Sequence, residues 1–173
     1  MENKFRIVFK TGLWILLLAG LAACQIGLSS YRGKTVKVEN RFDLQEGGPH
    51  KESWQTRDLL VEFQYLGAQQ ELQISGLVKP QTHILNFDIL RYLNVSLHFV
   101  DAGGKVLADA PIVYGGYRIA MPEQLAFKKN LKIPPDSTAI AFSYRGSALS
   151  GGGSGSGSDR SSGRIEWDFW QGP

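Results

Sequence analysis

The stretch Tyr92-Leu93-Asn94-Val95-Ser96-Leu97-His98-Phe99-Val100 decides the fold that we predict for this chain. Apolar and polar side chains alternate along it, which is the period-2 pattern of a β-strand with one buried face. The apolar set comprises Leu93, Val95, Leu97 and Phe99, and the set expected to face solvent comprises Asn94, Ser96 and His98. At about 3.3 Å per residue the stretch would be about 30 Å long. We therefore expect it near the centre of a sheet that has one solvated face.

Turn and strand signals continue on both sides of this segment. Asp101-Ala102-Gly103-Gly104 supplies turn residues, and the chain then returns through Lys105-Val106-Leu107, which predicts a hairpin. Similar strand patterns occur in residues 35–38, 59–65, 72–75, 111–119, 127–133 and 138–145. Residues 45–55, which contain Gly47-Gly48-Pro49, are polar, and we interpret them as a connection. The last pattern, 127–133, has the composition of an edge strand.

These signals place about seven or eight short strands within residues 34–146, and no helical period interrupts them. The sequence therefore predicts an all-β fold, an antiparallel β-sandwich of the immunoglobulin-like or transthyretin-like kind. Ile74-Ser75-Gly76, followed by Phe99-Val100-Asp101 with Gly104 and Val106, resembles small immunoglobulin-like bacterial surface domains of the FxLYD type. That resemblance implies an extracytoplasmic adhesion or scaffold module without catalytic residues.

The first 23 residues have the pattern of a secretory signal. Lys4, Arg6 and Lys10 precede an apolar run from Leu13 to Ala23, which is too short for the roughly 20 residues of a membrane span. Leu21-Ala22-Ala23-Cys24 follows, and Cys24 is the only cysteine in the chain. This arrangement resembles the lipobox of bacterial lipoproteins. An ordinary secretory signal with an incidental cysteine is the alternative.

The lipobox resemblance implies cleavage before Cys24 and a diacylglycerol thioether on its sulfur, usually joined by an acyl group on its amine. Several acyl chains anchor a protein stably where one would not. Gln25 follows the cysteine, where enterobacterial lipoproteins that stay in the inner membrane carry aspartate. Glutamine rather than aspartate at this position favours the outer membrane of a bacterial cell envelope. Residues 24–33 would then form a short lipidated tether.

Composition gives no indication of nucleic-acid binding. Residues 1–23 hold three of the 19 Lys and Arg residues and one of the 16 acids, which leaves a nearly neutral mature chain of 16 bases and 15 acids. Once Cys24 is acylated, no thiol remains for a disulfide or a metal cluster. The three histidines, His50, His83 and His98, share no metal-ligand spacing, so we expect no metal site, no cofactor and no enzyme activity.

The C-terminal region combines a polar segment with an aromatic end. Residues 147–163 are dominated by glycine and serine, a composition typical of a flexible linker. Residues 164–173 follow and contain Trp167, Phe169 and Trp170. This aromatic motif could add a last strand to its own domain, or it could bind a partner by strand addition or through aromatic anchors.

The sequence thus supports two functions of different kinds. The first is a non-catalytic, lipid-anchored envelope protein that belongs to a membrane-associated assembly and binds another envelope protein through Trp167, Phe169 and Trp170. The second is a glycan- or small-ligand-binding surface lipoprotein that uses Trp54, Tyr114 and Tyr117 as a stacking platform beside Gly115-Gly116.

Overall fold

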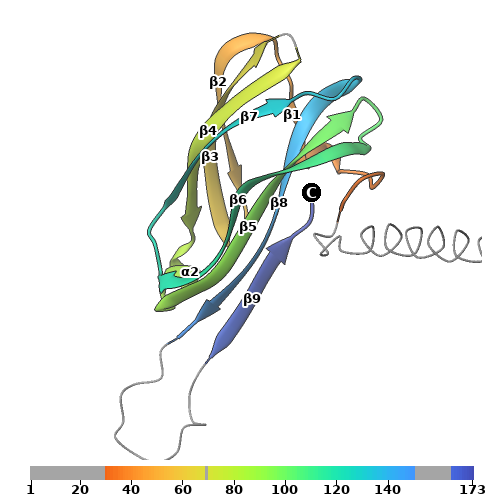
Figure 1. The fold of residues 1–173 in the computed structure, drawn as a ribbon. Coiled ribbons are helices and arrows are strands. Elements are labelled where there is room, and N and C mark those ends of the chain that lie inside the picture. The colour runs from red at the N-terminus through yellow and green to blue at the C-terminus, as the bar shows by residue number, and fades with distance from the viewer. Residues whose placement is uncertain (1–29, 69, 151–164) are drawn as a thin grey trace, which may run out of the picture. The chain divides into compact units, whose positions relative to one another are not determined.

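Two antiparallel sheets packed face to face make up the part of the chain from Tyr31 to Pro173 (Figure 1). The computed structural model describes residues 30–68, 70–150 and 165–173. Within these residues there are nine strands: β1 (Phe42–Asp43), β2 (Gly47–Gln55), β3 (Leu59–Ala68), β4 (Glu71–Pro80), β5 (Ile89–Asp101), β6 (Val106–Ala120), β7 (Leu125–Lys132), β8 (Ser137–Leu149) and β9 (Glu166–Gln171). Two short helical turns, η1 (Val38–Asn40) and α2 (Thr82–Leu85), complete the described elements. The predicted all-β sandwich is confirmed at this level.

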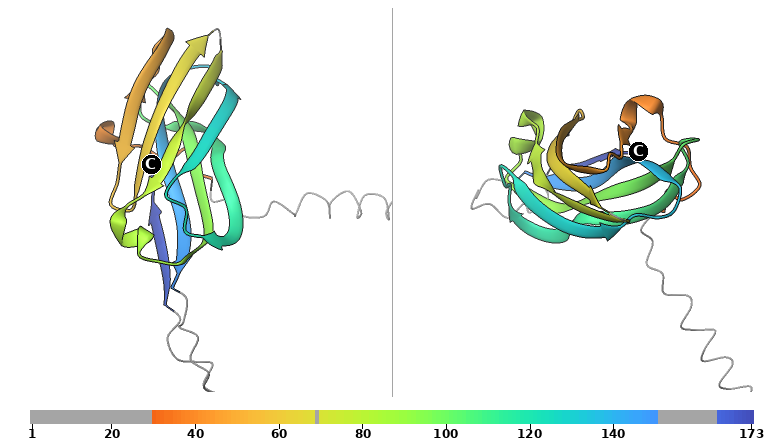
Figure 2. Two further views of the ribbon diagram at one scale, coloured as in Figure 1. Left: turned by 90° about the vertical axis from the view of Figure 1, so that its left-hand side faces the viewer. Right: turned by 90° about the horizontal axis from the view of Figure 1, so that it is seen from above.

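One sheet has five strands and the other has four. The five-stranded sheet has the order β1-β8-β5-β6, with β9 as a further partner of β8, and the four-stranded sheet has the order β2-β3-β4-β7. The two turned views in Figure 2 show the sheets as separate layers. The predicted signal peptide (residues 1–23), Cys24 and most of the Gly/Ser-rich segment lie outside the described residues.

β5 is a central strand, as its alternating sequence predicts. It pairs with β6 on one side and with β8 on the other. Its apolar residues Leu93, Val95 and Phe99 lie between the sheets and are almost fully buried. They pack into a core that is rich in aromatic rings, in which Trp54 stacks on Phe142 with ring centroids 5.6 Å apart.

The expectation that His98 faces solvent is wrong. His98 points away from the core, as predicted, but only 1% of its surface is exposed. The N-terminal segment covers it, because the Tyr31 ring lies edge-on against the imidazole at a centroid distance of 5.2 Å. A second small apolar cluster continues this cover and comprises Val36, Val100, Val106, Ala139 and Ala141, with Tyr31 packed against them. The folded unit therefore begins at Tyr31, before the predicted boundary at residue 34.

The polar stretch 45–55 is largely a strand rather than a connection. Within it, β2 pairs with β3 and forms one edge of the four-stranded sheet. Most of its side chains are exposed, and Trp54 is its one buried residue. A polar composition is normal for an edge strand, because charge at an edge disfavours pairing with other chains. The opposite edge is β7, which agrees with the edge strand predicted at 127–133.

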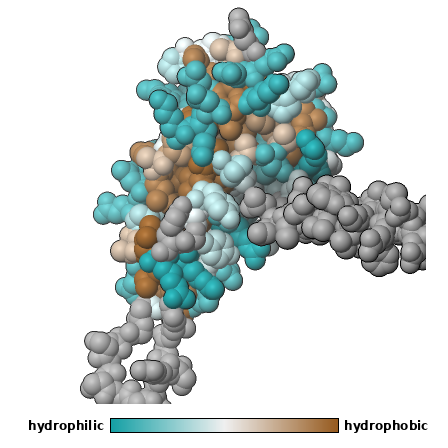
Figure 3. Space-filling view, viewed as in Figure 1, coloured by the Kyte–Doolittle hydropathy of each residue, from teal (hydrophilic) through white to brown (hydrophobic). Residues whose placement is uncertain are grey.

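On the face shown in Figure 3, a central band of hydrophobic side chains is bordered by hydrophilic ones. Among the described residues, no helix has both the length and the apolar character that a membrane span requires. Exposed large hydrophobic side chains include Tyr114, Trp167 and Trp170. These three residues belong to the five-stranded sheet, which makes that sheet a candidate binding surface.

Candidate interaction surface

The C-terminal aromatic motif forms strand β9 on its own domain. It pairs with β8 in antiparallel register, from Tyr144 opposite Gln171 to Leu149 opposite Glu166. Of the two predicted roles for the motif, the structure therefore contains the added strand. β8 runs to Leu149, three residues beyond the predicted domain boundary at 146. Figure 1 shows β9 beside the C-terminal half of β8.

Phe169 is the apolar anchor of β9. Its side chain is only 3% exposed and its ring centroid lies 6.1 Å from that of Tyr144. The ring sits directly over Gly146, where an added Cβ would lie 2.4 Å from the Phe169 Cζ. Only a residue without a side chain leaves room for the ring, so Gly146 forms the notch that receives Phe169. The interruption of the alternating pattern of β8 by a glycine is the sequence signal that could have indicated this notch.

Polar contacts fix the beginning of β9. Glu166 accepts a hydrogen bond from the Arg91 guanidinium, with which it also forms an ion pair, and another from the Ser147 hydroxyl at 3.1 Å. The Arg57 guanidinium lies 5.6 Å from the centre of the Trp167 ring, which is cation–π geometry. These contacts connect β9 to β5, to β8 and to the turn between β2 and β3.

The three predicted partner-binding aromatics do not share one surface. Because side chains alternate along a strand, Phe169 points into the sandwich and Trp170 points away from it. Phe169 therefore belongs to the core, whereas Trp170 is 70% exposed. Trp167 lies on the same side as Phe169 but near the end of the sandwich, and it remains partly exposed. Among the described strands β9 pairs with β8 alone, so its second edge is open.

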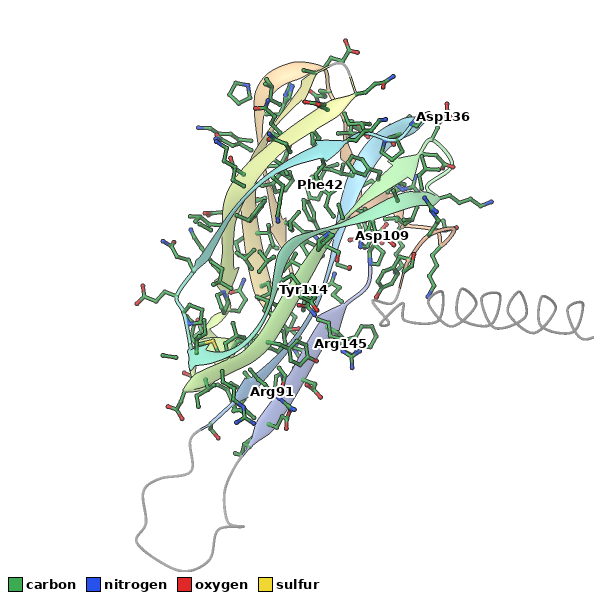
Figure 4. All side chains as sticks on the ribbon, viewed as in Figure 1. Phe42, Arg91, Asp109, Tyr114, Asp136 and Arg145 are labelled. Carbon is green, nitrogen blue, oxygen red and sulfur yellow. The ribbon has the colours of Figure 1, made fainter. Side chains whose placement is uncertain are left out.

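A row of four residues crosses the outer face of the five-stranded sheet. Tyr114 on β6 is the register partner of Asn94 on β5, Asn94 is the partner of Arg145 on β8, and Arg145 is the partner of Trp170 on β9. Directly opposed residues point to the same face, and at about 4.8 Å per strand the row is about 15 Å wide. Tyr114 is 63% exposed, and the Arg145 side chain makes no hydrogen bond or ion pair within the described residues. Figure 4 labels Tyr114 and Arg145 on this sheet, with Arg91 nearby.

The predicted stacking platform is not assembled as a unit. Trp54 is buried between the sheets, on β2 of the four-stranded sheet. Tyr114 lies on the outer face of the other sheet, so the two rings cannot contact one ligand. The side chain of Tyr117 lies outside what the structure describes. The sequence indicated Tyr114 as a candidate ligand-binding aromatic. It could not indicate the neighbours Asn94 and Arg145, because they lie on two other strands.

A buried polar chain lies beside this row, at the edge of the N-terminal cover. His98 Nδ1 lies 2.6 Å from Asp109 Oδ1, and His98 Nε2 lies 2.7 Å from Ser143 Oγ. The other carboxylate oxygen of Asp109 accepts the backbone N–H of Tyr31 at 3.1 Å. Burial lowers the pKa of His98 below its usual value, although the Asp109 carboxylate opposes this shift. A neutral imidazole satisfies both contacts, since its Nδ1–H donates to Asp109 and its Nε2 accepts from the Ser143 hydroxyl.

The order of carboxylate, imidazole and hydroxyl is also the order found in serine hydrolases. Here Ser143 is 5% exposed and Tyr31 covers the imidazole, so no substrate can reach the hydroxyl in this arrangement. This hydrogen-bonded network of Asp109, His98 and Ser143 instead connects the strands β5, β6 and β8 to the segment that begins at Tyr31. Among the described residues, no group of three or more His, Cys, Asp and Glu side chains is placed to hold a metal ion.

Comparison with protein-family models, with curated proteins and with solved structures finds no match to this chain. Any functional conclusion therefore depends on its own residues and their arrangement.

Gly146→Ala should release β9 without unfolding the sandwich. The new Cβ would occupy the position of the Phe169 ring, so the anchor could not enter its notch. Hydrogen exchange measured by mass spectrometry should show that the amides of residues 166–171 lose protection, while those of β5 keep it. Gly172→Ala is the matched control, because its Cβ would come no closer than 3.7 Å to Tyr31. Equal protection of β9 in both variants would contradict the notch.

His98 should make the domain less stable in acid. Because burial lowers its folded pKa below the unfolded value of about 6.5, the unfolded state takes up a proton first as the pH falls. The free energy of unfolding from urea titrations should therefore decrease from about pH 7.5 to about pH 5.5. In His98→Gln the decrease in the free energy of unfolding should be smaller. The difference between the two curves gives the contribution of His98. Parallel curves would show that His98 does not contribute.

Proposed function

We propose that this chain is a non-catalytic, lipid-anchored protein of the bacterial envelope that binds another envelope protein. Its anchor is diacylglycerol and an N-acyl group on Cys24, in the outer membrane rather than the inner one, and its sandwich is of the immunoglobulin-like or transthyretin-like kind. The lipobox pattern at residues 21–24 supports the anchor. Tyr31, where the folded unit begins, is seven positions after Cys24, so the tether can extend at most about 25 Å.

The open edge of β9 is the observation that carries the binding proposal. A strand that is paired on one side only presents unpaired backbone N–H and C=O groups, to which an extended segment of another protein can add. β9 is stably placed for this role, because Phe169 fixes it to Gly146 and Glu166 fixes it to Arg91. Trp167 offers apolar area beside the edge, and tryptophan is enriched among residues that dominate binding energy.

Charge on β9 narrows the kind of partner. Glu166 is engaged by Arg91, whereas the exposed Asp168 has no hydrogen-bonded or ionic side-chain partner among the described residues. Opposite charges on facing strands stabilise their pairing, and like charges destabilise it. The partner that fits is an extended segment with a basic residue opposite Asp168 and an apolar residue against Trp167. The same acids disfavour pairing of β9 with a second copy of itself.

Site-specific photocrosslinking in living cells tests the binding proposal. A benzoylphenylalanine introduced at Trp167 should give one discrete protein adduct, and the adduct should disappear when Asp168→Lys reverses the charge on the edge. The matched control places the same group at Gln64, an exposed position on the four-stranded sheet. An equal adduct from both positions, or an adduct that Asp168→Lys does not affect, would refute strand addition at β9.

A further inference from the structure

The outer face of the five-stranded sheet has a covered part and an exposed part. Residues from Tyr31 to Val36 cover the end near His98 and Val100. The row of Tyr114, Asn94, Arg145 and Trp170 occupies the neighbouring part, which no described segment covers. Folding alone gives no reason to keep a tryptophan and a tyrosine this exposed on one face.

The chain enters the folded unit on this same face. Tyr31 packs against His98 on the outside of the sheet, and a Cβ added to Gly172 would lie 3.7 Å from the Tyr31 ring. Gly172 is two residues after Trp170, so at about 3.3 Å per residue the exposed indole is attached within about 7 Å of this meeting point. Tyr31, the residue at which the folded unit begins, therefore lies close to Trp170.

The position of Tyr31 bears on membrane binding because only a short segment joins it to the proposed lipid anchor at Cys24. The inference therefore rests on the proposed function. Tyr31 can be at most about 25 Å from Cys24. The hydrogen bond from its backbone N–H to Asp109 and the hydrogen bond from the Arg32 Nε to the Leu107 carbonyl fix the start of the unit to this sheet. The exposed row consequently lies on the face of the sheet to which Tyr31 is attached.

Trp170, Tyr114 and Arg145 on this face are side chains that favour a membrane surface. The same side of β9 also carries two acids, Glu166, which pairs with Arg91, and the exposed Asp168. Tryptophan and tyrosine are enriched at the membrane–water interface, where the ring contacts apolar groups and its polar atom contacts headgroups. Arg145 supplies a guanidinium that binds phosphate in a bidentate manner. From Gln25 to Val38 the sequence contains Arg32, Lys34 and Lys37 but no acid. Basic residues beside an anchor are attracted to anionic lipids.

We propose that the outer face of the five-stranded sheet lies on the anionic headgroup layer of the membrane that holds the anchor. Trp170 and Tyr114 insert among the headgroups, and Arg145 binds a lipid phosphate between them. The face of a sheet and its edge point in perpendicular directions. With this face on the membrane, the open edge of β9 points along the bilayer surface, where another envelope protein can reach it.

Quenching of tryptophan fluorescence by brominated lipids tests this orientation. The full lipoprotein is reconstituted into vesicles of phosphatidylglycerol and brominated phosphatidylcholine. Its mature chain has three tryptophans, Trp54, Trp167 and Trp170. Trp170→Phe should remove most of the quenching, whereas Trp167→Phe should retain it, because the two residues point to opposite sides of β9. Arg145→Gln should reduce the quenching, as should replacing phosphatidylglycerol with a neutral lipid.

Mass spectrometry of Cys24 in the same preparation separates the two possible failures. In one outcome Cys24 carries lipid and the protein is incorporated, while the fluorescence of Trp170→Phe and of Trp167→Phe is quenched equally by the brominated lipid. In that case the orientation is wrong and the proposed anchor stands. If Cys24 carries no lipid, both the anchor and the orientation are overturned. Quenching of Trp170 that is as strong in vesicles without anionic lipid as in vesicles with phosphatidylglycerol would overturn the role of Arg145 and of the headgroup charge.

Discussion

The pairing of β8 with β5 is the interaction on which the rest of this structure depends. These two long strands stay in register from Ile89 opposite Leu149 to Asp101 opposite Ser137, with irregularities only near the two ends. On their inner side they contribute Phe99, Phe142 and Tyr144 to the core. On their outer side they present His98 and Ser143 to each other and Asn94 to Arg145. β1 and β9 both add to the free edge of β8.

Because both faces of this pair are used, the domain has two apolar clusters of unequal size. The larger lies between the sheets, and the smaller lies under Tyr31 and Val36 on the outside. The polar chain from Asp109 through His98 to Ser143 lies beside the smaller cluster. A buried polar group is costly unless it is hydrogen-bonded, and this chain pairs its members with one another and with the backbone of Tyr31. It therefore fixes the start of the folded unit to the sheet.

The two proposals depend on the surroundings of Tyr31, where the folded unit begins. A domain held by a short tether, as proposed here, would have a limited range of orientations. Tyr31, where that tether would end, lies on the face that carries exposed Trp170, Tyr114 and Arg145. The open edge of β9 borders the same face without being part of it. One surface for lipid and one edge for a protein segment can thus coexist on a single small sandwich. Both depend on Gly146. Its notch holds Phe169, and this contact fixes the position of the β9 edge and the side to which Trp170 points.

The sequence by itself determined what depends on local patterns. The alternation in residues 92–100 predicted a central strand with its apolar side inward, and the repeated strand and turn signals predicted the antiparallel sandwich.

The tertiary structure decided what depends on contacts between distant residues. His98 is buried because Tyr31, 67 positions earlier in the chain, covers it, and no local pattern encodes that cover. The polar strand β2 forms because its partner β3 supplies the hydrogen bonds, so its own residues needed no strand-like alternation. Phe169 lies in the core and Trp170 on the surface because the register of β9 on β8 decides the side to which each ring points. A shift of the register by one residue would exchange the two sides.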